Sequence, residues 1–330
     1  MWSINSGYNF NSLKRSYLNL RIGSTSKDYA SSGVNPLLNT FSSLLFRYNW
    51  LKLYESRFAN ASFRTEIVNG LRMGVAVSWE KRGVLENTTG FSFFRPHRDY
   101  TPNLLPNPFA TGDVEGYNAL MPVNHSNLAF IGELSYTLRQ RYKMSDKVKV
   151  NLDSDYPTFH LLWKHGYNYN DTLKGSYDLI RGDVSMHRNL GAMRQMRWSI
   201  GGGAFFEKQN LQLQDMYIFN TQTSAVLLNN YEDVFYLKPG YSISAVSQFA
   251  EAHIRYTTPC LLLKRLPVLS RTLIRENLTG SWLWTPEYGH YYEAGYSLSE
   301  IYLFAEAGVY AGFRDLSFDS AGLRIIFIIN

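Results

Sequence analysis

The sequence predicts an all-β fold, an antiparallel transmembrane β-barrel of about twelve strands with one short helix. Segments of about ten residues alternate apolar and polar side chains, which suits a tilted strand that crosses a bilayer. Aromatic residues make up 15% of the chain and charged residues only 18%, and rings with one apolar and one polar end suit a membrane interface. No run of about eighteen apolar residues occurs, so we expect no transmembrane helix.

Two elements are expected before residue 60. The first is a strand near residues 17–24. In the stretch that follows, apolar side chains recur with a period of about 3.6, which predicts a helix over residues 41–58. These side chains are Phe41, Leu44, Leu45, Tyr48, Leu51 and Phe58. The helix would cover one end of the barrel.

The stretch FRTEIVNGLRMGVAVSWEKR, residues 63–82, predicts a β-hairpin. Asn69-Gly70 supplies the two positive-φ residues of a type I′ turn. The second limb has one apolar and one polar face, and in an outer-membrane barrel the apolar face meets lipid while the polar face lines the lumen. The lipid-facing candidates are therefore Leu71, Met73, Val75, Val77 and Trp79, and the lumen candidates are Arg72 and Glu80.

The same alternation predicts the remaining strands. They cover residues 127–139, 157–166, 176–187, 195–206, 246–256, 272–284, 290–298, 301–313 and 321–329. In the last strand, Leu323 and Ile325 are further lipid-facing candidates. Two long loops are expected, over residues 83–126 and 207–245. No repeat or linker divides the chain, so residues 1–330 are expected to form a single barrel domain.

Charged side chains of both signs fall on the lumen-facing positions of these strands. The stretch EAHIR places Glu251, His253 and Arg255 on one strand face, where an acid, an imidazole and a guanidinium could bind an anionic solute or relay a proton. The other lumen candidates are Arg72, Glu80, Glu133, Arg139 and Arg275. The simpler interpretation is a solvated lumen whose charges pair with one another.

The residues predict no catalytic centre, metal site or cofactor. The Gly-x-Ser-x-Gly, His-Glu-x-x-His and P-loop patterns do not occur. Cys260 is the only cysteine, which excludes an intrachain disulfide and a cysteine-based zinc site. His97 and Asp99 form a candidate pair on a loop, although polar loop tips are usually only solvated. The net charge of +6 comes from scattered lysines and arginines, so nucleic acid is not an expected partner.

Four stretches occur in a characteristic order: NWLKLYESRF, NGLRMGVAVSWEKRGVLENTT, YPTFHLLWKHG and FAEAHIRYTTPCLLLKRLPVLSR. Together they resemble the C-terminal region of a Bacteroidetes outer-membrane family of unknown function, whose full-length members begin with a carboxypeptidase-regulatory-like domain. The resemblance implies an outer-membrane β-barrel distantly akin to surface-antigen and assembly-factor barrels, with no established activity. The opening residues show no secretory signal, so either the chain is a fragment of a longer precursor or the barrel interpretation is wrong.

The sequence therefore favours a non-enzymatic protein of the Gram-negative outer membrane, with a channel role or an envelope assembly or scaffold role. Its expected partners are outer-membrane lipid and, through the N-terminal domain that the resemblance implies, other envelope proteins. Two alternatives stay open. One is an outer-membrane hydrolase with its active site on the rim loops. The other is a soluble β-barrel that binds a ligand and buries the apolar faces of its strands.

Overall fold

The computed structural model describes residues 1–30, 35–88, 90–95, 97–105, 122–145, 148–172, 174–191, 193–222, 224–228, 233–262, 265, 267 and 271–328. Its helices are α1 (Pro36–Phe46) and the 3-10 helix η1 (Leu213–Asp215). Its strands are β1 (Trp2–Asn11), β2 (Ser16–Asp28), β3 (Leu53–Val68), β4 (Leu71–Gly83), β5 (His125–Thr137), β6 (Tyr142–Ser145), β7 (Val148–Asn151), β8 (Thr158–Tyr169), β9 (Lys174–Gly191), β10 (Arg194–Phe206), β11 (Tyr217–Ile218), β12 (Val226–Leu228), β13 (Ser244–Ala245), β14 (Gln248–Thr258), β15 (Arg275–Thr285), β16 (Gly289–Ile301), β17 (Ala305–Arg314) and β18 (Ser317–Phe327).

One large sheet dominates the fold. It has fourteen strands in the order β1-β2-β3-β4-β5-β8-β9-β10-β14-β15-β16-β17-β18-β12. All of them except β12 form an antiparallel meander, and β12 pairs parallel with β18. The predicted closed barrel is not observed among the described residues, because β1 and β12 are the two edges of an open sheet. The meander has an odd number of alternating strands, so β1 and β18 run in the same direction, and β12 already covers part of the edge of β18.

The predicted count of about twelve strands was wrong, since the described residues form eighteen. Each of the twelve predicted segments overlaps a strand, and the structure adds β1 and five short strands. One face of β1 carries apolar side chains such as those of Trp2 and Tyr8. The other face consists largely of asparagine and glycine, which have low strand propensity. The five short strands, β6, β7, β11, β12 and β13, have two to four residues each, which is too short for a periodic signal.

The helix predicted over residues 41–58 was placed too late in the chain. The side chain of Asn35 caps the first turn of α1, and Arg47 ends the helix with a left-handed backbone at φ 58°. Phe58 matched the helical spacing but lies in β3. No described helix is long and apolar enough to cross a membrane.

The hairpin predicted around Asn69-Gly70 is formed by β3 and β4. Gly70 has a φ of 86°, whereas Asn69 does not have a positive φ, so the turn is not the predicted type I′. A register shift between Glu66 and Val68 on β3 accounts for the difference, because a bulge beside the turn changes the turn geometry that the strands require.

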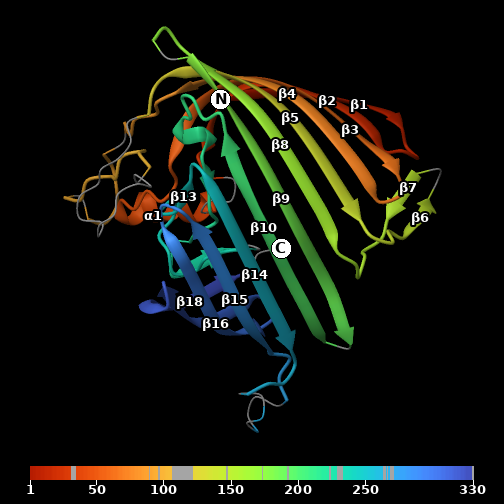
Figure 1. Cartoon of the computed structure of the whole chain (residues 1–330). Coiled ribbons are helices and arrows are strands. Elements are labelled where there is room, and N and C mark those ends of the chain that lie inside the picture. Colours follow the sequence, from red (N-terminus) through yellow and green to blue (C-terminus); the bar gives the residue numbers. More distant parts are fainter. Residues whose placement is uncertain are drawn as a thin grey trace.

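The sheet is strongly curved (Figure 1). It curls around the described part of residues 207–247, between β10 and β14, which we call the inner segment. The hydroxyl of Tyr241 in this segment donates to Asp28 of β2 at 2.6 Å. The carbonyl of Tyr236 accepts from Arg324 of β18 at 2.6 Å. One segment therefore contacts strands near both edges of the sheet, and the face that it touches is the concave one.

The largest core cluster lies between the inner segment and the concave face. Phe219, Phe235 and Ile243 of the inner segment pack in a buried cluster with strand residues that include Phe205 and Phe249. A long loop was predicted over residues 207–245, and the described part of that connection fills the inside of the sheet. In the other expected loop, over residues 83–126, residues 106–121 lie outside the described part of the chain.

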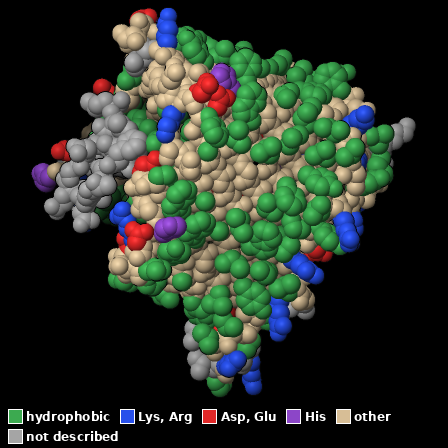
Figure 2. All heavy atoms as spheres, in the orientation of Figure 1, with side chains coloured by type: hydrophobic (Ala, Val, Ile, Leu, Met, Phe, Trp, Pro, Cys, Tyr) green, Lys and Arg blue, Asp and Glu red, His purple; other side chains and the backbone are tan. Residues whose placement is uncertain are grey.

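The convex face carries large apolar side chains that no other described element covers (Figure 2). Examples from three strands are Val75, Ile200 and Leu323, which are 48%, 56% and 54% exposed. Figure 2 shows these side chains as a broad band over the strands, with most charged side chains toward its margins. The sheet thus exposes apolar side chains on its convex face, and on its concave face it encloses charged side chains together with the buried apolar cluster.

Candidate functional site

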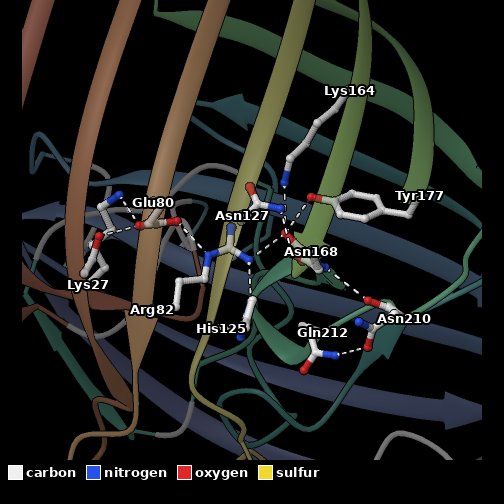
Figure 3. A network of polar contacts seen from close by, with 12 residues as sticks. Lys27, Glu80, Arg82, His125, Asn127, Lys164, Asn168, Tyr177, Asn210 and Gln212 are labelled. Atoms are coloured by element: carbon white, nitrogen blue, oxygen red, sulfur yellow. Dashed lines mark hydrogen bonds and ion pairs between the residues drawn. The ribbon is translucent and has the colours of Figure 1, made fainter. Parts of the chain in front are cut away.

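The densest polar group of the concave face surrounds Asp215 of η1 (Figure 3), whose side chain is fully buried. Arg82 of β4 donates to its Oδ1 at 2.9 Å, and the hydroxyl of Tyr177 of β9 donates to the same oxygen at 2.5 Å. Asn168 of β8 donates to Oδ2 at 2.8 Å, and Nζ of Lys164 lies 3.3 Å from Oδ1. Three strands therefore hold one carboxylate of the inner segment.

Glu80 extends this group toward β2. It accepts from Nε of Arg82 at 2.7 Å, and Nζ of Lys27 lies 2.5 Å from its other oxygen. Ser56 of β3 also donates to Glu80. Glu80 and Arg82 are two residues apart on β4, so their side chains share the concave face. The result is a chain of paired charges from Lys27 of β2 to Lys164 of β8, which the Tyr177 hydroxyl of β9 joins by a hydrogen bond (Figure 3).

Neutral amides complete the hydrogen bonds around Asp215. Nδ2 of Asn127 donates to Oδ1 of Asn168 at 2.7 Å, and Nδ2 of Asn168 also lies 3.1 Å from the carbonyl of Asn210. Gln212 donates to the side chain of Asn210 at 2.5 Å. Strand side chains thus bond both to the carboxylate and to the backbone of the inner segment, which fixes the position of η1.

The Asp215 carboxyl is held in its ionised form. Burial alone would raise its pKa, but the positive charges of Arg82 and Lys164 and the hydrogen bonds from Tyr177 and Asn168 outweigh burial and hold the pKa well below the ordinary value of 3.8. A carboxylate that is ionised at neutral pH and fully paired is suited to anchoring a segment and poorly suited to proton transfer.

A second anchor fixes the inner segment to β16 and β18. The backbone N–H groups of Tyr236 and Leu237 donate to the carboxylate of Glu293 at 2.7 and 2.9 Å. The hydroxyl of Tyr291 donates to Glu293 at 2.7 Å. Nζ of Lys238 lies 2.8 Å from Asp319 of β18. The two anchors hold the inner segment against opposite halves of the sheet.

Glu251, His253 and Arg255 of β14 share the concave face, as the sequence analysis predicted. They contact different parts of the protein. Glu251 accepts from the hydroxyl of Tyr217 in the inner segment. The ring of His253 lies 4.8 Å from that of Phe235, and its Nδ1 is 3.0 Å from Oγ of Ser281. Glu251 and His253 therefore lie under the inner segment.

The side chain of Arg255 has contacts that differ from those of Glu251 and His253. Its Nη2 donates at 2.7 Å to Oε2 of Glu306, a fully buried residue of β17. Glu306 also accepts from the hydroxyl of Ser297 at 2.6 Å. Arg255 thus points to a polar region beside β15 and β17 and does not form one site with Glu251 and His253.

The structure spreads the other lumen candidates along the concave face. Glu80 is the buried partner of Arg82 described above, whereas Arg72 of β4 is exposed and Glu133 of β5 is half-exposed. Arg275 opens β15. Arg139 does not line a strand as expected, because β5 ends at Thr137 and Arg139 occupies the following turn with a φ of 48°.

The lipid-facing candidates lie on the convex side of β4 and β18. Val75, Val77 and Trp79 are exposed, and so is Leu323. Leu71, Met73 and Ile325 are partly exposed.

Among the described residues, no group of three or more histidine, cysteine, aspartate or glutamate side chains could hold a metal ion. His97 and Asp99 lie on the exposed connection after β4, and no hydrogen bond between them is found in the described part of the loop. The carboxylates of Asp215 and Glu293 already accept several hydrogen bonds each.

Sequence reasoning missed the residues that hold Asp215. Lys164 and Asn168 lie four residues apart on β8, so their shared face could have been read from period two, yet nothing in the sequence linked them to a carboxylate. Asp215 itself lies in an irregular stretch with no periodic signal. Its contact with Arg82 joins positions 133 residues apart, which only the folded chain reveals.

Comparison with known proteins gives a family and similar chains among the solved structures. The model of the C-terminal domain of a family of unknown function, DUF5686, matches residues 1–298. No curated protein matches the chain. Among solved structures, BamA from Haemophilus ducreyi lacking POTRA domains 1–3 is similar, with a TM-score of 0.48, 9% sequence identity and coverage of 98% of this chain. This chain spans 61% of the length of that BamA chain.

Proposed function

The chain belongs to the DUF5686 family, whose C-terminal domain matches residues 1–298, and we propose that it is an outer-membrane protein of Gram-negative bacteria. Its convex face lies in lipid, and its concave face is closed by its own inner segment. Its role is non-enzymatic, as a scaffold or assembly component of the envelope that works with other envelope proteins and does not act as an open channel.

The contrast between the two faces of the sheet carries this proposal. Val75, Val77 and Trp79 alternate along β4 with residues of the concave face and are 48%, 43% and 39% exposed. A soluble barrel would bury such a face, whereas a protein in a bilayer exposes it to lipid and keeps its charges inside. Apolar side chains of β10 and β18 are exposed in the same way, which supports a membrane environment over the soluble alternative.

The inner segment supports a scaffold role over a channel. Its buried aromatic side chains and its two ionic anchors fill the space that a solute would need on the concave face. Opening that space would break several buried charged contacts, and removing one partner of a buried ion pair typically costs about 3 to 5 kcal/mol. A constitutively open pore is therefore disfavoured.

A matched pair of arginine substitutions on β4 tests the membrane environment. Val75→Arg places a charge on the convex face, and Ala76→Arg places it on the concave face one residue away. We expect Val75→Arg to destabilise the inserted protein by about 2 to 4 kcal/mol and Ala76→Arg to do so by much less. The measurement is urea-induced unfolding from lipid vesicles. Equal effects of the two substitutions would contradict a lipid-facing convex surface.

Planar bilayer recording tests the closed concave face. A folded sample, checked by heat-modifiable migration in gels, should give no stable conductance steps. Regular steps from the folded protein would contradict the scaffold role and favour a channel.

A further inference from the structure

A cavity of about 490 Å³ lies between α1 and the described part of the connection that follows β4. One wall comes from residues within 39–53, and the other comes from residues within 85–103. The backbone N–H of Phe93 donates to the carbonyl of Leu44 at 2.9 Å and joins the two walls. The volume falls within the range of about 300 to 1,000 Å³ that is typical of small-ligand pockets.

Asparagine side chains that bond to one another line this cavity. Nδ2 of Asn49 donates to Oδ1 of Asn103 at 3.3 Å, and Nδ2 of Asn103 donates to Oδ1 of Asn87 at 3.0 Å. Asn103 also donates to the carbonyl of Leu85 at 3.0 Å and is only 7% exposed. These hydrogen bonds orient the amide groups before a ligand binds, which lowers the entropic cost of binding.

Two amide groups of the lining keep hydrogen-bonding capacity. Oδ1 of Asn39 accepts from the backbone N–H groups of Trp50 and Leu51 at 2.8 and 3.0 Å, which assigns the other end of the amide as Nδ2. No described oxygen accepts from this Nδ2, and no described donor reaches Oδ1 of Asn49. The cavity therefore offers an amide donor and an amide acceptor, and a hydroxyl group, which both donates and accepts, can bond to either.

The rest of the lining favours an uncharged ligand with an apolar face. Glu86 is the charged residue of the described lining, which contains no lysine or arginine, so an anion would meet only like charge. Phe91 is 57% exposed and supplies aromatic surface to the cavity. The hydroxyl of Tyr100 lies 2.7 Å from the carbonyl of Phe91 and 2.9 Å from that of Ser43, so it holds the Phe91 backbone against α1.

We propose that this cavity binds a neutral saccharide, as a mono- or disaccharide unit. Sugar hydroxyls both donate and accept hydrogen bonds, which fits the free groups of Asn39 and Asn49. The positively polarised C–H groups of a sugar ring fit the negative face of an aromatic ring such as that of Phe91. The site goes beyond the proposed scaffold role, and it holds whether or not the convex face lies in lipid.

Saturation-transfer NMR of the full chain tests the site, with cellobiose, maltose, lactose and diacetylchitobiose as probes. The protein is folded in a detergent without sugar groups, so that the detergent does not compete. We expect saturable binding of at least one probe. Asn39→Asp keeps the acceptor for Trp50 and Leu51 but loses the Nδ2 donor, and Phe91→Ala removes the exposed ring. Each should weaken the affinity by about tenfold.

Asn124→Asp and Phe93→Ala are the matched controls. Oδ1 of Asn124 accepts from the backbone N–H of Val84 at 2.9 Å, a bond of the same kind as those of Asn39, and Phe93 is 62% exposed. Neither residue belongs to the described lining of the cavity. Saccharide affinity should be unchanged in both variants. Heat-modifiable migration in gels checks that every variant is folded.

Three results would overturn the saccharide site. The first is the absence of saturable binding of every probe by the folded, unsubstituted protein. The second is full affinity in folded Asn39→Asp and Phe91→Ala, because the sugar would then bind elsewhere. The third is equal weakening by Asn124→Asp and Phe93→Ala.

Discussion

Asp215 shows how a single residue can fix a long connection. An isolated buried carboxylate is costly, and this one is stable because Arg82, Lys164, Asn168 and Tyr177 all reach it. These partners lie on β4, β8 and β9, so the charge of one inner-segment residue ties together three strands. Removing it would leave Arg82 with Glu80 as its remaining ionic partner.

The first prediction concerns the free energy of unfolding. Asp215→Asn should destabilise the folded protein by about 3 to 5 kcal/mol, because it leaves buried cations without their shared anion. The control is Asp155→Asn, which removes one partner of an exposed pair with Arg141. That substitution should cost about 1 kcal/mol or less. Urea-induced unfolding in micelles, followed by tryptophan fluorescence, measures both, and similar losses would contradict the anchor role of Asp215.

The second prediction concerns pH. The pKa of Asp215 is depressed in the folded state, because the nearby cations outweigh burial, so the folded protein binds this proton less readily than the unfolded chain does. The stabilisation is therefore complete above the ordinary pKa of 3.8 and is lost as pH falls below it. The difference in unfolding free energy between the unsubstituted protein and Asp215→Asn should stay constant from about pH 7 to about pH 5 and shrink below about pH 4. A difference that shrinks near neutral pH would contradict the depressed pKa.

Residues on regular strands were easier to predict than their partners. The period-two alternation of β4 correctly separated Glu80 from Trp79, because successive side chains of a strand point to opposite faces. The identity of the group that pairs with a concave-face charge depends on which segment folds across the sheet. That information does not reside in local spacing, so Lys27 and Asp215 were not found as partners of Glu80 and Arg82.

At the scale of the strand, tyrosines packed over glycines connect neighbours. Tyr177 of β9 lies directly opposite Gly166 of β8, and Tyr310 of β17 lies opposite Gly295 of β16. A Cβ atom at Gly166 would lie 2.2 Å from the ring of Tyr177, and one at Gly295 would lie 2.3 Å from the ring of Tyr310. Because glycine has no side chain, each tyrosine ring can lie flat across the neighbouring strand. This arrangement stabilises glycines in sheets.

Gly166→Ala tests this arrangement. The added methyl group should displace the Tyr177 ring, weaken its hydrogen bond to Asp215 and lower the free energy of unfolding by about 1 to 3 kcal/mol. Gly132→Ala on β5 is the control, because its Cβ would lie 3.7 Å from Trp163, an ordinary contact. Comparison of the two unfolding curves is the measurement. A neutral Gly166→Ala would show that the ring position is not needed.

Strands in which apolar and polar side chains alternate over most of their length were predicted well. The helix, whose bounds depend on its capping residues, was not. All twelve predicted strand segments overlap real strands because their alternation spans most of each element. The helix was displaced because a cap at Asn35 and a left-handed residue at Arg47 decided its bounds, while Phe58 extended the periodic pattern by coincidence.

At the scale of the whole molecule, the sheet is held curved by the segment it encloses. The contacts of Tyr241 with β2 and of Tyr236 with β18 connect its two halves through the interior. A closed barrel was expected from the sequence, but β1 was missed, and β1 brings the meander to an odd number of strands, so its first and last strands run in the same direction. The outer edge of β1 has no partner strand among the described residues, and unpaired backbone is costly in hydrocarbon. The central strands, β4 included, are therefore the place to test immersion.

The most direct test of a lipid-facing convex surface is nitroxide labelling at two adjacent positions of β4. Cys260 is exposed and would be replaced by serine, after which Val75→Cys and Ala76→Cys each carry one label. Collision rates with oxygen, which concentrates in lipid, and with a water-soluble nickel complex are measured in vesicles. We expect the label at residue 75 to meet oxygen and not the nickel complex, and the label at residue 76 to be shielded from oxygen. Access of the nickel complex to the label at residue 75 would contradict a convex face in lipid.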